Sequence, residues 1–485
     1  MQMGRLIWAL LAVVALGGAA QGRVKVIEDQ RGSLKTLTSI GDALDSPDHH
    51  PVHVLYVHGI DQVGGGDSSL LRQSICTRLK LCDVADWTNA GTEFADKGEF
   101  APGLPPPALE YLGSPIWNTP EEWSAAAPFV VHWMVHLRGH RTPLVVDEIN
   151  WWPIALSLKC RRVMIPEAYL AGPDQRLLSV CSDKSAQDPE GFGRFYPWIA
   201  PEQVEKLENI RPHSVLLNRA LKDTLVDWGL ADVLLATGPL GGIMRDGVRQ
   251  LIAKSAAFDP TQAEAPGGDG RGKYNWNAQL SHTILDQEFV GVTHSLGSYL
   301  LFNTLSLENS GPTPAQQSAA DAARIAREEN AVRYIFERTS MIYFLANQLE
   351  MLEITNLENA PPASTTANQS RGLAPPPVPI NPAANFISLV NQWKEMQTNF
   401  QAGLHPGNTA AQQKVQVVAF SDPNDVMTFR VPRIGDVDVI NLYVQNATRW
   451  FGLLESPSGA HSYYAKNKAV LLVMFGDTAH QGAPN

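Results

Sequence analysis

The feature that most constrains the fold of this chain is a buried-type strand that runs into an apolar helix with almost no connection. Residues 289–293 form a short apolar run typical of an interior strand, and residues 296–307 continue as an apolar helix. Only His294 and Ser295 stand between them. So tight a turn needs a positive φ and small neighbouring residues, and it predicts a strand–turn–helix unit with Ser295 at its apex.

Strands and helices alternate along much of the chain. Apolar runs predict strands at residues 53–57, 129–137, 143–149, 340–346, 415–420 and 437–444. Apolar spacing and capping residues predict helices at residues 154–160, 313–337 and 466–475. A further helix is expected with Asp67 as its N-cap. The runs at 129–137 and 143–149 are expected to pair across the turn at 138–142. This alternation favours an α/β fold with a mainly parallel sheet covered on both faces.

The composition is that of a packed globular protein. Hydrophobic residues make up 44% of the 485 and charged residues 18%, which favours one elaborated domain over residues 21–485. Residues 84–279 hold nine of the twelve tryptophans and several breaks rich in Pro or Gly, so we interpret this stretch as an inserted cap region around the core. Residues 361–382 contain seven prolines and are expected to form a surface loop.

The first twenty residues have the pattern of a signal peptide. Arg5 precedes an apolar stretch at residues 6–16, and small residues follow at 17–20. We therefore expect export to a periplasm or to the exterior, with cleavage near Ala20. The alternative is that the segment is retained as an N-terminal anchor.

Charge and cysteine content limit the classes of partner and fold. The formal net charge is -11, and the lysines and arginines form no long run that could neutralise a phosphate backbone, so nucleic acid is not an expected partner. Four cysteines in an exported chain predict two disulfides among three possible connectivities, the alternative being four buried thiols. They are Cys76, Cys82, Cys160 and Cys181.

Residues around Ser295 and toward the C-terminus supply the parts of a nucleophilic site. The segment Thr-His-Ser-Leu-Gly at 293–297 matches the pattern G-x-S-x-G except at Thr293. Among thirteen histidines, His461 is the candidate base, because it is expected on a loop between the last strand and the terminal helix. The candidate acid is Asp425, four positions beyond a strand end, with Asp422 as the alternative acid or as a residue that caps the turn.

Other groups of polar or aromatic residues are less specific. His132, His136 and His140 have the spacing of metal ligands on a helix, but their segment also fits a hairpin arm, so we expect no metal. Asp147 and Glu148 are adjacent on a strand and therefore face opposite sides, which argues against a glycosidase pair. Tryptophans between 117 and 152 either line an apolar pocket or belong to the core.

Four segments together resemble a lipase or esterase of the α/β-hydrolase superfamily. They are a strand ending in His58-Gly59, the strand–T-H-S-L-G–helix unit, a strand followed by S-D-P-N-D at 421–425, and A-H-S-Y at 460–463. The resemblance covers about half of the chain. It departs from the family pattern at Thr293 and in the 234 residues (61–294) that separate Ile60 from Ser295.

The resemblance implies a doubly wound sheet of about eight strands with a large cap. It implies hydrolysis of a small-molecule or lipid ester through Ser295, His461 and Asp425, an acyl-enzyme, oxyanion donors at the amides of Ile60 and Leu296, and no cofactor. Alternatives within the fold are a thioesterase, an acyltransferase, or a lipase in peripheral contact with a membrane. The alternative outside enzymes is a catalytically silent binding protein of the cell envelope.

Overall fold

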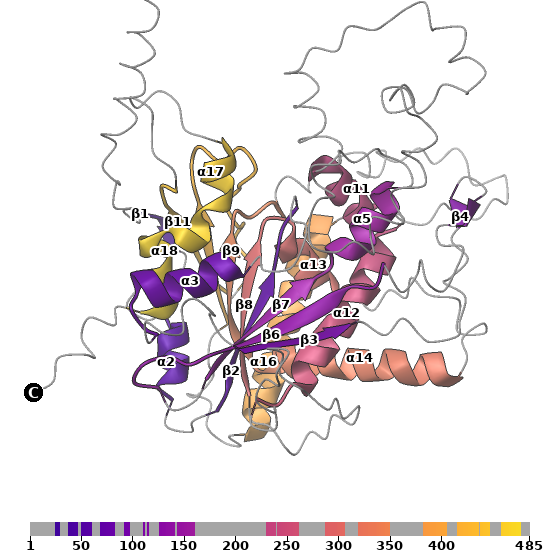
Figure 1. Ribbon diagram of the computed structural model, residues 1–485, viewed down its shortest axis with the longest axis horizontal. Coiled ribbons are helices and arrows are strands. Elements are labelled where there is room, and N and C mark those ends of the chain that lie inside the picture. Colours follow the sequence, from indigo (N-terminus) through magenta and orange to yellow (C-terminus); the bar gives the residue numbers. More distant parts are fainter. Residues whose placement is uncertain are drawn as a thin grey trace, which may run out of the picture.

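The chain folds around one large sheet with helices on both faces (Figure 1). The computed structural model describes residues 25–29, 37–46, 50–60, 68–82, 92–97, 110–111, 114–115, 126–140, 143–160, 229–238, 240–260, 287–305, 319–349, 382–404, 415–435, 437–446 and 457–476. The expected α/β class and the mainly parallel sheet are confirmed.

The main sheet has nine strands, in the order β1-β11-β10-β9-β8-β2-β7-β6-β3. Their bounds are β1 (Lys25–Asp29), β2 (Val52–Val57), β3 (Thr92–Lys97), β6 (Phe129–Val135), β7 (Leu144–Asn150), β8 (Glu288–His294), β9 (Thr339–Leu345), β10 (Gln416–Ser421) and β11 (Asp438–Tyr443). The six inner strands from β11 to β7 are parallel, while β1, β6 and β3 are antiparallel to their neighbours. A separate pair is formed by β4 (Glu110–Tyr111) and β5 (Ser114–Pro115).

All seven strands predicted from the sequence are present in the main sheet. The expected number of about eight is corrected to nine, because β1 and β3 extend the sheet at its two edges. Both edge strands mix charged with apolar residues, as in the sequence Lys-Val-Ile-Glu-Asp of β1, and so lack the apolar run that marks an interior strand. The predicted hairpin is confirmed, since β6 pairs antiparallel with β7.

Helices cover the sheet in two layers, and side chains on each strand alternate between two cores. Leu55 and Val57 of β2 face one core, and Val54 and Tyr56 face the other. The first core is covered by α5 (Trp152–Cys160), α11 (Ala231–Thr237), α12 (Gly241–Ala257), α13 (Gly297–Asn303), α14 (Ala319–Glu337) and α16 (Pro382–Leu404). The second is covered by α2 (Ile40–Leu44), α3 (Ser69–Arg78), the 3-10 helix η7 (Tyr464–Lys466) and α18 (Lys468–Phe475) (Figure 1). The short helix α17 (Pro457–Ser462) directly precedes η7 in the chain.

The strand order creates a topological switch point between β2 and β8. After β2 the chain adds β7 on one side, and it then returns to add β8 on the other side of β2. Ligands of open α/β sheets bind outside the carboxyl ends of the strands at such a point. These ends are followed here by Gly59 and by Ser295.

Part of the stretch interpreted as an inserted cap belongs to the sheet. Strands β3, β6 and β7 and helices α5, α11 and α12 all lie within residues 84–279, as does the β4–β5 pair, and much of the remainder of that stretch falls outside the described residues. The predicted signal peptide at 1–20 and the predicted helix N-cap Asp67 also lie outside the described residues. The same holds for the Pro-rich segment 361–382, apart from Pro382, which begins α16. Among the described helices, none has the length and apolar character that a membrane span requires.

A disulfide joins Cys76, on α3, to Cys82. The bond connects the last turns of α3 to the segment that leaves it, and it is one of the two pairs in one of the three possible connectivities. The Cys160 side chain and Cys181 lie outside the described residues.

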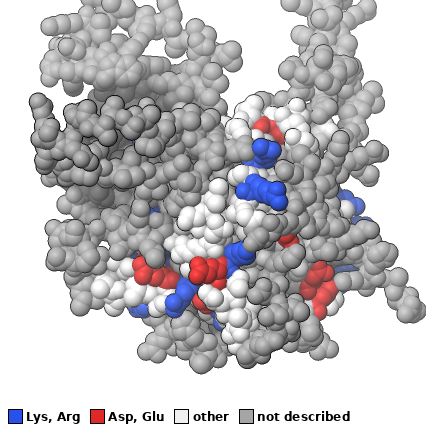
Figure 2. Space-filling model, turned by 180° about the vertical axis from the view of Figure 1, so that it is seen from behind, with Lys and Arg blue, Asp and Glu red and all other residues white. Residues whose placement is uncertain are grey.

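Charged side chains of both signs are interspersed on the face shown in Figure 2. On α14, Arg324 pairs with Glu328 at 2.6 Å and Arg333 with Glu337 at 3.7 Å, both at a spacing of four residues. Neighbours of opposite charge at this spacing stabilise a helix that has one face in solvent.

Candidate active site

Ser295 lies at the apex of a tight turn between β8 and α13. Its backbone φ is 54°, in the left-handed region that residues other than glycine rarely adopt. The amide of Ser295 donates to the carbonyl of Leu345 on the adjacent strand β9 at 2.8 Å, which holds the strained turn against the sheet. Strain of this kind costs about 1–3 kcal/mol and persists where surrounding contacts impose it, most often at functional sites.

Two glycines let the turn approach the end of β2. A Cβ atom on Gly297 would lie 2.2 Å from the carbonyl oxygen of Val57, so α13 can begin at this place only with glycine. A Cβ atom on Gly59 would lie 2.4 Å from the Cβ of Ser295. Thr293, which replaces the first glycine of the pattern, directs its hydroxyl to the carbonyl of Tyr343 at 3.4 Å and is thereby accommodated between β8 and β9.

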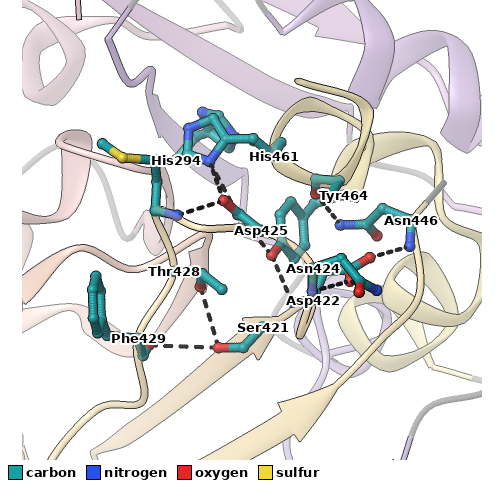
Figure 3. A network of polar contacts seen from close by, with 12 residues as sticks. His294, Ser421, Asp422, Asn424, Asp425, Thr428, Phe429, Asn446, His461 and Tyr464 are labelled. Carbon is teal, nitrogen blue, oxygen red and sulfur yellow. Dashed lines mark hydrogen bonds and ion pairs between the residues drawn. The ribbon is translucent and has the colours of Figure 1, made fainter. Parts of the chain in front are cut away.

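His461 pairs with Asp425 (Figure 3). The Nδ1–H of His461 donates to Asp425, with Nδ1 2.9 Å from Oδ1 and 3.0 Å from Oδ2. This hydrogen bond fixes the tautomer and leaves Nε2 as the basic nitrogen. His461 lies on the short helix α17 rather than on the expected loop, because residues 457–462 close one helical turn after β11.

The carboxylate of Asp425 is itself held by two donors. The Tyr464 hydroxyl donates to Oδ2 at 3.1 Å, and the backbone amide of Met427 donates to Oδ1 at 2.9 Å. Asp425 is 4% exposed, so these hydrogen bonds replace the water that its charge would otherwise require. The carboxylate is thus oriented toward the imidazole of His461.

Asp422, the alternative acid, is engaged elsewhere. Its Oδ1 accepts from the backbone amide of Asn424 at 3.0 Å in a local turn, and its Oδ2 accepts from the amide of Asn446 at 2.6 Å. Its own amide donates to the Tyr464 hydroxyl at 2.7 Å. Asp425 therefore faces the candidate base, and Asp422 organises the loop after β10 (Figure 3).

His294, the residue before Ser295, contacts His461 directly. Its Nε2–H donates to the backbone carbonyl of His461 at 2.8 Å, and the two ring centroids are 4.9 Å apart. Burial, and then the proximity of His461, lower the pKa of His294 to about 3, so its ring is neutral. The contact places the whole of His461 beside the turn that carries Ser295.

The reactive atoms of the candidate nucleophile and base are both buried. Neither Ser295 Oγ nor His461 Nε2 makes a hydrogen bond within the part of the chain that the structure describes. In enzymes without substrate, catalytic hydrogen bonds are often long and tighten when substrate binds. His294 connects the two residues, because it precedes Ser295 in the chain and donates to the carbonyl of His461.

The expected oxyanion donors are the backbone amides of Leu296, at the start of α13, and of Ile60, after the end of β2. Leu296 is the N-cap of α13, and the first amides of a helix have no partner within it, so they point outward as donors. Ile60 follows β2 by three residues. The turn before it is fixed by the Trp151 indole, which donates to the carbonyl of His58 at 3.0 Å and stacks on the His58 ring at 4.9 Å. Burial lowers the pKa of His58 to about 4.

The histidines with metal-ligand spacing do not converge. His132 lies on strand β6 and hydrogen bonds to Asp147 at 2.6 Å, while His136 is exposed and His140 pairs with Asp45. Asp147 and Glu148 face opposite sides of β7, since Asp147 binds His53 and His132 while Glu148 accepts from Ser68. No group of three potential ligands that could hold a metal occurs among the described residues.

Three residues of the site were not predicted from the sequence: His294, Tyr464 and Asn446. His294 stands inside the pentapeptide that identified Ser295, and Tyr464 follows His461 by three residues, so local sequence offered a signal for both. Asn446 donates through Nδ2 to the carbonyl of Ala460 at 2.8 Å, a contact that no spacing in the sequence indicates.

No family model, curated protein or solved structure matches this chain. The function is therefore inferred from the chemistry of the site.

Proposed function

We propose that this protein is a serine hydrolase with an α/β-hydrolase fold that cleaves carboxylic esters through an acyl-enzyme. The observation that carries the proposal is the His461–Asp425 hydrogen bond of 2.9 Å beside the strained turn of Ser295. A serine hydroxyl is a weak nucleophile until a base accepts its proton, and an oriented imidazole with a carboxylate partner is the usual base.

The topology supports the same proposal. The nucleophile follows β8, the acid follows β10 and the base follows β11, which is the chain order Ser, Asp, His of α/β-hydrolases. The residue after the nucleophile and a residue after β2 supply backbone amides at the switch point, as the oxyanion hole of that fold requires. Thr293 in place of glycine is compatible with the turn through its contact to β9.

Acylation begins when Ser295 Oγ attacks the carbonyl carbon of the ester and its proton passes to His461 Nε2. The carbonyl oxygen becomes an oxyanion that accepts hydrogen bonds from the amides of Ile60 and Leu296. Asp425 stabilises the imidazolium through Nδ1–H without taking the proton. When the intermediate collapses, the bond to the alcohol oxygen breaks, and that oxygen leaves with the proton of Nε2.

Deacylation repeats these steps with water. His461 Nε2 takes one proton from water while the water oxygen attacks the acyl carbon and forms a second oxyanion. Collapse breaks the bond to Ser295 Oγ, which regains its proton from Nε2, and the carboxylic acid is released. All groups return to their starting state, so the chain's own residues complete the cycle.

Labelling with a fluorophosphonate, which reacts with activated serines, tests the proposal. We expect the wild type to be labelled and Ser295→Ala to remain unlabelled at an unchanged melting temperature. Ser255→Ala is the matched control, because Ser255 is equally buried but lies on α12, and its labelling should equal that of the wild type. A folded wild type that does not react would overturn the proposal.

Substrate class is tested with p-nitrophenyl esters of increasing chain length, emulsified triglycerides and acyl thioesters. Hydrolysis of short soluble esters without a rate increase at an interface would exclude the lipase alternative. Faster turnover of thioesters than of matched oxygen esters would favour a thioesterase, and transfer to an added alcohol in preference to water would favour an acyltransferase.

A further inference from the structure

We propose that His294 is a positioning residue for the base: its side chain holds the backbone of α17 so that His461 Nε2 faces Ser295 Oγ. The inference rests on the proposed function and adds to it a residue outside the triad. It starts from a hydrogen bond between residues 167 positions apart, from Nε2–H of His294 to the carbonyl oxygen of His461 at 2.8 Å.

The carbonyl that His294 binds lies at the end of a helix. Helix α17 spans Pro457–Ser462, and the last four carbonyls of a helix have no partner within it. Gly459 accepts from the amide of Tyr463 at 3.2 Å, Ala460 accepts from the side chain of Asn446 at 2.8 Å, and His461 accepts from His294. His294 is therefore the donor that ties this helix end to the turn of Ser295.

These contacts fix His461 at separate points. Asp425 holds the ring at Nδ1, His294 holds the carbonyl of the same residue, and Asn446 holds the preceding carbonyl. A ring held only at Nδ1 can still swing about that hydrogen bond and carry Nε2 away from the nucleophile. The tether to His294 removes this freedom, because His294 and Ser295 are consecutive in the chain.

The charge of His294 suits this role. The groups around its ring are His461, Asp425, His58 and Tyr464, and burial together with His461 keeps His294 neutral. A neutral ring donates to the carbonyl without adding a positive charge beside His461, which must itself become positive during acylation. A charged His294 would oppose that step.

His294 is poorly suited to be the base itself. Its Nε2 is committed to the carbonyl of His461, and its Nδ1 lies close to Gly59, 2.9 Å from the position that a Cβ atom there would take. Within the described residues, Nδ1 has no hydrogen-bond partner, and in particular no carboxylate that would raise its basicity. Of these two histidines, it is His461 that has such a partner, Asp425.

Substitutions that keep or remove the donor test the inference. His294→Gln places an amide N–H near the former Nε2, while His294→Phe keeps the ring volume and removes the donor. We expect the Phe variant to lower kcat for p-nitrophenyl acetate and the rate of fluorophosphonate labelling by roughly 10- to 100-fold at little changed KM, as a small misplacement of a catalytic group does. The Gln variant should recover most of the rate. His136→Gln, at an exposed histidine, is the control.

The outcomes separate the two proposals. If the folded wild type does not react with the fluorophosphonate, the proposed serine hydrolase function is refuted, and the positioning role of His294 is refuted with it. A reactive wild type with equal kcat and equal labelling rates in the Phe and Gln variants overturns the positioning role. Should the Phe variant fail to fold, His294→Asn takes its place, because its amide is one methylene shorter than that of Gln and does not reach the carbonyl. Equal rates for Asn and Gln then overturn the role as well.

Discussion

Gly59 and Ser295 are in contact across the switch point of the sheet: a Cβ atom on Gly59 would stand 2.4 Å from the Cβ of Ser295. The same atom would stand 2.9 Å from both Nδ1 and the carbonyl oxygen of His294. Distances this short cannot be relieved by rotating one flexible side chain, because the neighbours include the backbone of the strained turn. The space beside Gly59 therefore determines where Ser295 lies.

Gly59→Ala should displace Ser295 and reduce both stability and catalysis. Overpacking by one methyl group costs typically 1–3 kcal/mol of unfolding free energy. A displacement of Ser295 Oγ by a fraction of an ångström should lower the fluorophosphonate labelling rate by roughly 10-fold or more. Labelling kinetics and urea denaturation of the same preparation measure the two effects.

Gly403→Ala is the matched control for that substitution. Gly403 lies on helix α16, and a Cβ atom there would meet nothing within 4 Å. Alanine in a helix is more favourable than glycine by about 0.5–1 kcal/mol, so this variant should be at least as stable as the wild type and equally reactive. Unchanged labelling in Gly59→Ala would mean that the turn can move without affecting the nucleophile.

Asp425→Asn should have a much larger effect on kcat than Asp422→Asn. An asparagine at 425 no longer stabilises the imidazolium and can favour the wrong tautomer of His461, a change that costs about 10⁴-fold in a serine triad. Asp422 binds backbone amides of Asn424 and Asn446, so its substitution should lower the melting temperature and reduce kcat only modestly. Steady-state kinetics with p-nitrophenyl acetate distinguish the two, and an equal loss of kcat in both variants would contradict the choice of acid.

Local patterns in the sequence were sufficient for most of the sheet and insufficient for its edges. The interior strands are apolar runs because both faces of a parallel sheet are covered, and such runs are readable without knowledge of their partners. Helix α12 was not predicted, because Arg245, Arg249 and Lys254 interrupt its apolar face. All three side chains are nevertheless buried. Polar or charged partners replace water around them, as where Arg249 donates to the carbonyl of Thr304.

Candidate site residues could be chosen from the sequence where chemistry restricts the residue type, and not where it restricts only the position of a residue in the fold. A nucleophile, a base and an acid need Ser, His and Asp in a known chain order, so Ser295, His461 and Asp425 could be chosen from sequence. The residues that hold them in place are donors to backbone carbonyls or carboxylates, and many residue types serve for this. Tyr464 and Asn446 become recognisable only when the chain has folded.

Tyr464→Phe should lower both stability and activity. It removes the hydroxyl that donates to Asp425 and accepts from the buried amide of Asp422, and an unsatisfied buried donor costs about 1–3 kcal/mol. With one support of Asp425 lost, kcat should fall several-fold at unchanged KM.

Tyr343→Phe separates the two effects. Tyr343 is also fully buried, and its hydroxyl donates to the carbonyl of Met474 at 3.2 Å, away from the candidate triad. We expect a similar loss of stability, measured by urea denaturation, with kcat unchanged. If both variants lost kcat in proportion to their loss of stability, Tyr464 would have no role beyond packing.

Asp147 should make stability depend on pH through a buried cluster that it forms with two histidines. Its Oδ2 accepts from His53 Nδ1 at 2.8 Å and its Oδ1 from His132 Nδ1 at 2.6 Å, and all three side chains are at most 1% exposed. Burial alone would raise the pKa of Asp147, but the charges and hydrogen bonds of the two histidines outweigh it and lower the pKa.

A carboxyl group with a lowered pKa contributes stability that is fully present above its unfolded pKa, about 3.9, and is lost as the pH falls through the folded value. Asp147→Asn should therefore reduce the free energy of unfolding at pH 7 by about 3–5 kcal/mol, as breaking a buried pair does. The difference from the wild type should narrow below about pH 4. Urea denaturation between pH 7 and pH 3 measures it, with Asp45→Asn as a surface control, and a difference that stayed constant over this range would show that the charge of Asp147 does not stabilise the fold.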